Sequence, residues 1–326
     1  MKKFTAMAAL AAFVATTALA VPAMSQDYPN QPVTVVVPFS AGGPTDTVAR
    51  LIAEVMSKDL GEQVVIQNVG GAGGTLGAGQ VAAAPNDGYT LLLHHIGMST
   101  APTLYRSLPY DPIADFAPIG LITSVPMTLV ARKDFEPTTL AELMEFIKAN
   151  GENVTYAHAG IGSASQLCGM LLMDALDAQM TTVPYQGAGP AMTDIIGGQI
   201  DMICDQSTNT TSQIRAGEVK AYGVTTAERL ANLPDLPTTT EGGLDLQIGV
   251  WHGLYAPVGT DPAIIARLET SLQGAPADET VISRFAELGT VPVTAEEAKP
   301  AALAATLTEQ IALWKGVIEA AGVYAD

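Results

Sequence analysis

The segment from Val33 to Met56 constrains the fold more than any other part of the chain. A β-branched run ends at Pro38, a short turn with Gly42 and Gly43 follows, and apolar residues then recur at helical spacing. This order predicts a β-strand, a tight glycine loop and an α-helix. Such a loop directs unpaired backbone N–H groups at one point, where the helix dipole also favours negative charge. The segment is therefore either an anion-binding corner or an ordinary strand-to-helix connection in which Gly43 supplies a positive φ.

Apolar β-runs alternate with helical patterns along nearly the whole chain. This alternation predicts an α/β fold with mostly parallel sheets. The length favours two domains. Because no flexible linker is visible, we expect the chain to cross between them on strands, near 123–127 and 246–251. The expected strands are 33–38, 64–68, 89–94, 126–131, 153–157, 181–185, 200–204, 219–224 and 248–256. The expected helices are 45–60, 76–84, 139–149, 164–177, 189–197, 262–273, 278–287 and 296–320.

Residues 1–25 have the features of a secretory signal peptide. Lys2 and Lys3 precede an apolar stretch without charge over 4–19, which is short for a membrane span. Small residues offer cleavage after Ala20, Ala23 or Ser25, and the last leaves a soluble start. No cysteine lies near these positions, so we expect no lipid anchor. The mature protein is predicted to be periplasmic and soluble, without a direct membrane anchor.

The charge balance is strongly acidic. The full chain carries 15 Lys and Arg against 33 Asp and Glu, for a formal net charge of −18, and loss of the leader removes two of the basic residues. This charge disfavours nucleic acid and anionic membrane surfaces as partners. It would also repel an anionic ligand, so local backbone dipoles and hydroxyl groups would have to bind one.

Cys168 and Cys204 are the two cysteines of the chain. Export to an oxidising compartment favours a disulfide between them, and the alternative is two buried thiols. The bridge would close a loop of about 36 residues and contribute roughly 2–4 kcal/mol.

Several familiar motifs are absent or weak. Residues 77–82 match G-x-G-x-x-A formally, but 85–88 stop the following helix and no acidic residue lies at the usual distance, so we interpret the match as a glycine turn. Neither a Walker loop nor a G-x-S-x-G elbow occurs. No histidine has metal-ligand spacing. We therefore expect no metal and no cofactor. The histidines are His94, His95, His158 and His252.

Three more strand-to-helix corners carry small, polar, donor-rich residues, at 158–166, 184–191 and 204–211. Each alone could be a capped turn, but open α/β sheets bind ligands at such strand ends. One of the two histidines at 94–95 is expected to face the cleft. Asp205 is a candidate for orienting a ligand hydroxyl or amine, whereas Asp46 is interpreted mainly as a helix cap.

A series of short motifs runs in a fixed order along the mature chain. They are Tyr28-Pro29-Asn30-Gln31-Pro32-Val33, 37–43 with Asp46 and Ala49-Arg50, 71–74, 85–91, 108–112, Gly162-Ser163, 184–187 and 197–201. Together they resemble the substrate-binding proteins of tripartite tricarboxylate transporters, the Bug family of periplasmic solute receptors. The resemblance covers essentially all of the mature chain.

This resemblance implies a two-lobed, type II-like (Venus-flytrap) periplasmic binding fold, each lobe a mostly parallel sheet flanked by helices. Lobe 1 would comprise 26–125 plus 250–326 and lobe 2 would comprise 126–249. Two glycine-bearing loops, 39–46 and 158–166, would bind carboxylate oxygens through backbone amides, hydroxyls and ordered water. The chain departs from the family at 94–97, where a small polar strand end is common, and at Ser165-Gln166, where a histidine is frequent, so ligand identity does not carry over. The two cysteines with Asp205-Gln206 resemble one subgroup.

The implied function is capture of a small organic carboxylate (a di- or tricarboxylate, or an aromatic carboxylate) by a monomer that is not an enzyme. Hinge closure would hold the ligand for delivery to membrane permease subunits of a tripartite tricarboxylate transporter. One alternative is a ligand-sensing subunit for a signalling receptor. Another is an exported serine hydrolase using Ser163 and His158, although no orienting acid is identifiable. The expected binding residues are Phe39, Ser40, Ala41, Gly42, Gly43, Thr45, Asp46, His95, Gly97, His158, Gly160, Gly162, Ser163, Ser165, Tyr185, Asp205 and Gln206.

Overall fold

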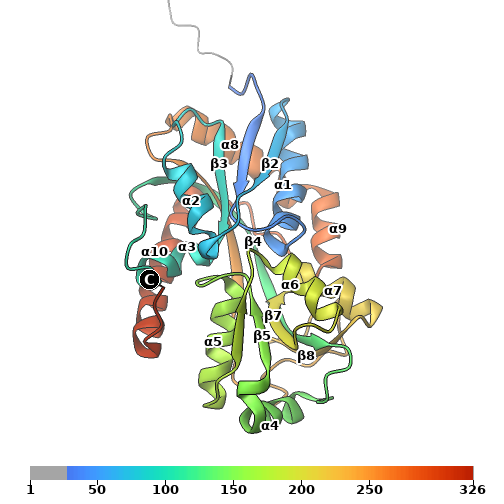
Figure 1. Cartoon of the computed structure of the whole chain (residues 1–326). Coiled ribbons are helices and arrows are strands. Elements are labelled where there is room, and N and C mark those ends of the chain that lie inside the picture. The colour runs from blue at the N-terminus through green and yellow to red at the C-terminus, as the bar shows by residue number, and fades with distance from the viewer. Residues whose placement is uncertain (1–27, 326) are drawn as a thin grey trace, which may run out of the picture.

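The structure is a computed structural model that describes residues 28–325, so the predicted signal peptide lies outside the described residues. Two α/β lobes lie one above the other (Figure 1). The upper one, lobe 1, contains strands β1 to β3, and the lower one, lobe 2, contains β5 to β8. The strands are β1 (Val33–Val37), β2 (Val64–Asn68), β3 (Thr90–His95), β4 (Phe116–Arg132), β5 (Thr155–His158), β6 (Thr181–Pro184), β7 (Met202–Gln206), β8 (Val219–Val224) and β9 (Gly249–Pro257).

Helices cover the strands of both lobes (Figure 1). The α-helices are α1 (Pro44–Leu60), α2 (Thr75–Ala82), α3 (Gly97–Leu104), α4 (Leu140–Asn150), α5 (Ala164–Leu176), α6 (Ala188–Ile196), α7 (Ser207–Ala216), α8 (Pro262–Gln273), α9 (Glu279–Glu287) and α10 (Pro300–Ala321). Short 3₁₀ turns are η1 (Ala72–Gly74), η2 (Gly151–Asn153) and η3 (Ala275–Ala277).

The strands form one curled sheet in the order β2-β1-β3-β9-β4-β7-β5-β6, with β8 also paired to β4. The predicted fold class is confirmed, but the sheet is mixed rather than mostly parallel. β1 is parallel to β2 and β3, and β5 is parallel to β6 and β7. Every antiparallel pairing involves β4 or β9. The reason is that β4 leads the chain out of lobe 1 and β9 leads it back, so these two strands run in opposite directions.

The junction between the lobes lies on β4 and at the start of β9. Pro126 pairs with Gly249, and the next residue of β4, Met127, already pairs with β7. The Thr225 hydroxyl ties the returning chain to this point, because it donates to the carbonyl oxygen of Ile248 at 2.6 Å and accepts from the Met127 amide at 3.2 Å. The exact lobe boundaries, at 126 and 249, stay a prediction.

Local sequence explains how α1 is placed. Gly43 precedes the helix, Pro44 occupies its first turn, and Gly61 ends it with a φ of 76°. Val48, Ile52 and Met56 are buried, on the face that packs on the sheet. The strand before it is buried on both sides, since Val35 and Val36 are 3% and 0% exposed. A rigid strand and a packed helix therefore fix the glycine loop between them.

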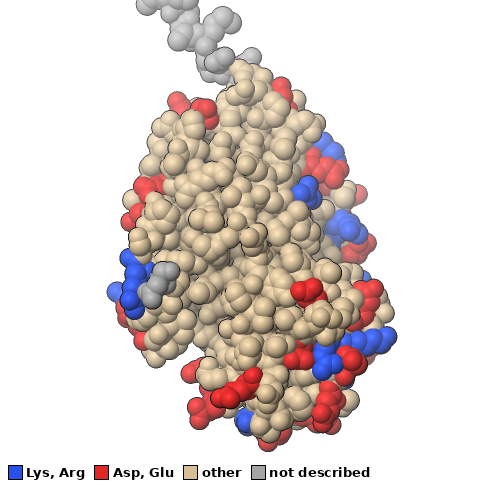
Figure 2. Space-filling view, in the orientation of Figure 1, with Lys and Arg blue, Asp and Glu red and all other residues tan. Residues whose placement is uncertain are grey.

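Charged side chains gather at the edges of the face seen in Figure 2. They follow the side that carries α1, α9 and α7 and the tip that carries α4, while the middle of this face has few. The acidic charge is thus spread over the periphery. In the part of the chain that the structure describes, no helix is both long and apolar enough to cross a membrane.

Candidate functional site

A small, narrow cavity, partly open to solvent, lies between the two lobes. Lobe 1 contributes residues from the β1–α1 loop and the end of β3, and lobe 2 contributes the starts of three helices. None of the lining residues is Lys or Arg. The lining residues are Phe39, Pro44, Thr45, His95, Ala159, Ser163, Ala164, Ser165, Ala188, Asp205 and Gln206.

Four helices begin at this cavity. The lining residues include the first positions of α1, α5 and α6, and Gln206 directly precedes α7. Neither α1 nor α6 has a side-chain cap, so their first amide N–H groups are not satisfied in that way. The side-chain oxygen Oε1 of Gln206 is buried and has no hydrogen-bond partner within residues 28–325. Converging helix dipoles make this a site for an anionic group, and the unpartnered Gln206 oxygen, an acceptor, suits a hydrogen-bond donor such as a ligand hydroxyl.

The first glycine loop differs from the sequence prediction in one detail. Gly42, not Gly43, has the positive φ, at 75° against −84° for Gly43. The Gly42 amide donates to Oδ2 of Asp46 at 2.9 Å, and this bond holds the loop at the helix start. Gly42 turns the chain, and Gly43 is left in an ordinary extended conformation.

The Asp46 carboxylate makes its hydrogen bonds to residues of lobe 1. It also accepts hydrogen bonds from Arg50 at 2.9 and 3.0 Å and from Asn68 at 2.9 Å. Burial opposes the charge, but these bonds outweigh it and lower the pKa of Asp46. Asp46 does not line the cavity, and it shapes the loop as the capping interpretation expected.

The second glycine loop is held by its own hydroxyl groups. Ser163 caps α5 by accepting from the Gln166 amide at 3.3 Å, and Ser165 Oγ accepts from the Ala159 amide at 2.9 Å. Gly160 and Gly162 supply positive φ angles of 104° and 84°. The two serine oxygens lie 3.2 Å apart. This geometry presents both serines to the cavity on a rigid turn.

The predicted disulfide is confirmed: Cys168 on α5 is bonded to Cys204 on β7. Both residues are fully buried. The Tyr156 hydroxyl links the same elements, because it donates to the Ser165 carbonyl oxygen at 2.6 Å and accepts from the Cys204 amide at 3.2 Å. These connections fix the second loop relative to Asp205.

A buried aromatic cluster lies beneath the first loop. The rings of Phe39 and His95 stack with centroids 4.5 Å apart, and His94 and His252 contact His95 edge-on. Burial lowers the pKa of His94 and of His252 to about 3, and that of His95 well below its usual value. Because Nδ1 of His95 accepts from the Gly97 amide at 2.9 Å, the neutral ring carries its proton on Nε2. Of the two histidines at the strand end, His95 is the one that lines the cavity.

Asp205 and Gln206 close the cavity from β7. Asp205 is 2% exposed and Gln206 is 2% exposed. Burial raises the pKa of Asp205 to about 7, although hydrogen bonds from Asn209 and from the Gln206 amide favour its charged form. The Asn209 bond to Oδ2 is 2.6 Å long.

The other predicted residues surround the cavity without lining it. His158 is buried, and its Nδ1 accepts from the Gly160 amide at 3.2 Å. Tyr185 donates to Asp194 on α6 at 2.6 Å. Ser40 lies against the loop before α6, Ala41 and Gly42 are exposed, and Gly97 packs against the two histidines and Gly162.

The two lobes contact each other directly around the cavity. The Tyr105 hydroxyl of lobe 1 donates to the Ile161 carbonyl oxygen of lobe 2 at 2.8 Å, and the Thr100 hydroxyl donates to the Gly162 carbonyl oxygen at 3.2 Å. Gly73 and Gly160 also approach so closely that a Cβ on Gly160 would lie 2.7 Å from the Gly73 amide nitrogen. Glycines at the rim thus allow the backbones of the two lobes to meet.

Four lining residues lie in the predicted loops 39–46, 158–166 and 184–191 but were not singled out as binding residues: Pro44, Ala159, Ala164 and Ala188. Their side chains have no polar group, so residue chemistry gave no signal. Ala164 and Ala188 are nevertheless the first residues of helices that follow glycine loops. Position at a helix start, rather than residue type, would have identified them.

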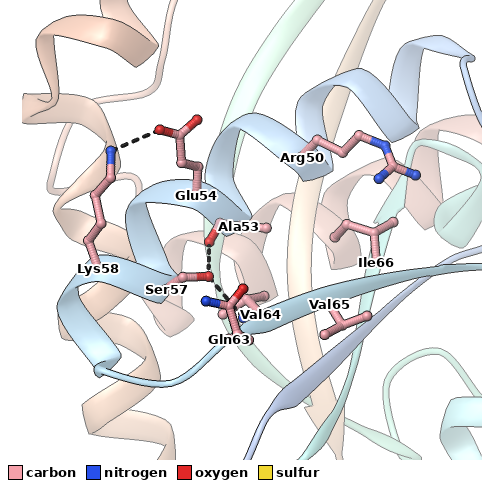
Figure 3. A pocket seen from close by; sticks show the side chains of 9 residues that line it. All are labelled: Arg50, Ala53, Glu54, Ser57, Lys58, Gln63, Val64, Val65 and Ile66. Carbon is pink, nitrogen blue, oxygen red and sulfur yellow. Dashed lines mark hydrogen bonds and ion pairs between the residues drawn. The ribbon is translucent and has the colours of Figure 1, made fainter.

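A more open groove lies on the outside of lobe 1, between α1 and β2 (Figure 3). Its charged residues are paired, Arg50 with Asp46 and Lys58 with Glu54, and the Ser57 hydroxyl bonds to the Ala53 carbonyl oxygen and the Val64 amide. No set of polar groups converges there. Across residues 28–325, no group of three or more His, Cys, Asp or Glu side chains is arranged to hold a metal ion.

Comparison with known proteins finds similar sequences and structures along most of the chain. A family model described as the tripartite tricarboxylate transporter family receptor matches residues 48–323. An Agrobacterium vitis protein, the UPF0065 protein in the TAR-I ttuE-ttuC' intergenic region, is 54% identical over 96% of this chain and 91% of its own length. The structure of the periplasmic binding protein BugD is 49% identical, with a TM-score of 0.89 over 92% of this chain and 100% of its own. MatC from Rhodopseudomonas palustris, solved with bound malate, is 43% identical, with a TM-score of 0.86 over 89% of this chain and 100% of its own.

Proposed function

Because the chain belongs to the tripartite tricarboxylate transporter family of receptors, we propose that it captures a small organic carboxylate between its two lobes and delivers it to the membrane permease subunits of such a transporter. Members of this family are periplasmic solute-binding receptors and not enzymes. We place lobe 1 at 26–125 plus 250–326 and lobe 2 at 126–249, with export to the periplasm and action as a monomer.

The convergence of four helix starts on a cavity without Lys or Arg carries this proposal. Oriented amides, the Ser163 and Thr45 hydroxyls and the His95 N–H are suited to carboxylate oxygens, and they cost little to desolvate compared with a buried lysine. The lining residues leave only a narrow space between the two lobes, which suits a small acid. The relative MatC binds such an acid, malate.

Hinge motion supplies the mechanism. The lining residues come from both lobes, so a ligand has all its contacts only when the lobes meet, and it shifts the population toward the closed form. We infer that the paired strands β4 and β9 form the hinge where they join the lobes, at Pro126 and Gly249. Transport or signalling would then depend on which membrane protein recognises the closed form.

The geometry gives no support to the hydrolase alternative. The Ser163 hydroxyl is engaged with the Gln166 amide and with Ser165, and His158 accepts from Gly160. No hydrogen bond joins Ser163 to His158 within the described residues, and no acid orients the imidazole.

Calorimetric titration with acetate, malate, adipate and citrate tests the proposed function, with glucose and lysine as neutral and cationic controls. We expect at least one of the di- or tricarboxylates to bind. Ala188→Leu would fill the cavity and should abolish that binding. Its matched control is Ala301→Leu, at an exposed position near the start of α10, which should bind as the wild type does. Binding only of glucose or lysine, or normal binding by Ala188→Leu, would contradict the proposal.

A further inference from the structure

Asp205 is an unexpected residue for an anion site. Among the residues that line the cavity it alone has an acidic side chain, and no lining residue is a cation. It is 2% exposed and stands at the end of β7, where the Thr128 hydroxyl contacts its carbonyl oxygen at 3.4 Å. Its carboxyl group has a single side-chain donor, Asn209, at 2.6 Å.

A bound carboxylate would share this small space with Asp205. Two carboxylates in one buried site without a cation cannot both be ionised at low cost, so one of them must hold a proton. The ligand would receive amide and hydroxyl donors from the helix starts, and these favour its charged form. Asp205 has fewer such donors and is therefore the group that takes the proton. In agreement, burial outweighs the hydrogen bonds from Asn209 and from the Gln206 amide and raises the pKa of Asp205 to about 7 even without a ligand.

We propose that Asp205, in its neutral form, donates a hydrogen bond to a carboxylate oxygen of the bound acid, so that the acid enters the cavity together with one proton. The proton comes from solvent and stays on the Asp205 carboxyl group. The inference rests on the proposed function, because it assigns a role to a residue of the same cavity. Asp205 is then a specificity residue. Protonated Asp205 allows an anionic acid to bind in the cavity, whereas ionised Asp205 repels it.

No group nearby takes over this role. His95 and His158 are neutral because burial lowers the pKa of each, and burial raises the pKa of the Tyr156 hydroxyl. On the remaining elements around Asp205, β4 presents Thr128, α5 presents Ser163 and Ser165, and α7 presents Asn209. The charged groups on the surrounding helices do not line the cavity; they are Asp46, Arg50, Glu54, Lys58 and Asp59 on α1, Asp174 on α5, Asp194 on α6 and Arg215 on α7.

Calorimetry with malate and, separately, with adipate between pH 6.5 and 8.5 tests the proposal. Both acids are ionised in solution over this range, so a proton taken up on binding is taken up by the complex of Asp205 and the acid. We expect the dissociation constant to rise with pH, approaching about tenfold per pH unit above pH 8. Repeating the titration in buffers of different ionisation enthalpy should show close to one proton taken up per acid bound at pH 8.5.

Two variants distinguish the effect of the Asp205 proton on binding from the effect of the shape of the site. Asp205→Asn keeps the size of the side chain and has no charge, so its affinity should be independent of pH and exceed that of the wild type at pH 8.5 by at least tenfold. Asn209→Ala removes the bond that favours the ionised form, so the pH dependence should move to higher pH. Circular dichroism shows whether each variant is folded. If a variant is unfolded, the number of protons taken up by the wild type still tests the proposal.

The outcomes distinguish this inference from the proposed function. Binding of malate or adipate without proton uptake and without pH dependence would overturn the role of Asp205 and leave carboxylate capture intact. Tighter binding at higher pH, lost in Asp205→Asn, would also overturn it, because binding would then require the ionised form of Asp205. Failure of every carboxylate to bind at any pH would instead contradict the proposed function.

Discussion

The backbone amide of Ser40 donates a hydrogen bond of 3.1 Å to the carbonyl oxygen of Gln186. Ser40 follows β1 in lobe 1 and Gln186 precedes α6 in lobe 2, so the bond joins the two lobes beside the cavity. The next residue, Gly187, lies against the same amide: a Cβ there would be 2.7 Å from the Ser40 nitrogen. The lobes meet at this point because Gly187 has no side chain.

Replacing Gly187 with alanine should therefore impair closure. Its backbone is extended, with a φ of 164°, so alanine adds no local strain and acts only through the contact across the cleft. We expect carboxylate affinity to fall at least tenfold while the melting temperature stays nearly unchanged. Calorimetry and thermal unfolding measure the two effects.

Gly43→Ala is the matched control for this change. A Cβ on Gly43 would lie 3.4 Å from the Ser40 carbonyl oxygen and 3.6 Å from the Gly189 amide nitrogen, which are ordinary contacts. Affinity should change by no more than about threefold, an energy of roughly 0.6 kcal/mol. An equal loss of affinity in both variants would show that the contact at Gly187 has no special importance.

Ser163→Ala should lower both stability and binding. The change removes the cap of α5, worth about 1 kcal/mol of folding free energy, and a hydroxyl that faces the cavity. Loss of one hydrogen bond to a charged group should weaken carboxylate binding by about 1.5–3 kcal/mol. Urea unfolding and calorimetry report the two quantities.

Thr139→Ala separates capping from ligand contact. Thr139 caps α4 in a capping box with Glu142, far along the chain from the lining residues. It should lose a similar folding free energy of about 1 kcal/mol and bind the carboxylate normally. Normal binding by Ser163→Ala would show that the Ser163 hydroxyl does not contact the ligand.

Much of the fold was predictable because the buried strands and amphipathic helices have clear periods. The first half of β4 was missed, since Pro118 and Gly120 are unusual in a strand. The strand forms there because it pairs with β9 over most of its length, with two register shifts that accommodate these residues. Tertiary pairing therefore outweighed the local sequence.

Two helices were missed for a related reason. α3 contains Gly97 and Pro102, and the sequence of α7, Ser-Thr-Asn-Thr-Thr-Ser, is rich in residues that favour turns and strands. In α7 the Thr210 hydroxyl bonds to Thr128 and the Thr211 hydroxyl to the Leu288 carbonyl oxygen, so buried polar contacts replace an apolar face. The loops around the cavity were found from glycines and hydroxyls, but the cavity itself depends on how two distant lobes meet.

Reduction of the Cys168–Cys204 disulfide should destabilise the protein without changing its fold. The bond closes a loop of 36 residues and is fully buried, so its loss should lower the unfolding free energy by about 2–4 kcal/mol. Guanidinium unfolding with and without a reductant measures this. A Cys168→Ala/Cys204→Ala variant should match the reduced wild type and be insensitive to reductant. Equal stability of oxidised and reduced wild type would contradict the prediction.

The buried histidines should make the protein sensitive to mild acid. Burial lowers the pKa of His94 and His252 to about 3 and that of His95 well below 6.5, so the folded state keeps them neutral. Below about pH 6.5 the unfolded chain takes up protons that the folded chain does not. The unfolding free energy therefore decreases as the pH is lowered. Each such histidine contributes up to about 1.4 kcal/mol per pH unit.

Comparing the pH dependence of the unfolding free energy of His252→Gln with that of the wild type isolates the contribution of the His252 proton. Asp205 acts in the opposite direction between about pH 4 and 7, because its raised pKa gives the folded state the extra proton, but it is common to both proteins and cancels. Urea unfolding between pH 7 and 5 should therefore show a shallower loss of stability in the variant, by a difference that approaches about 1.4 kcal/mol per pH unit toward pH 5. Parallel curves would mean that His252 titrates alike in the folded and unfolded chains, which its complete burial in the aromatic cluster argues against.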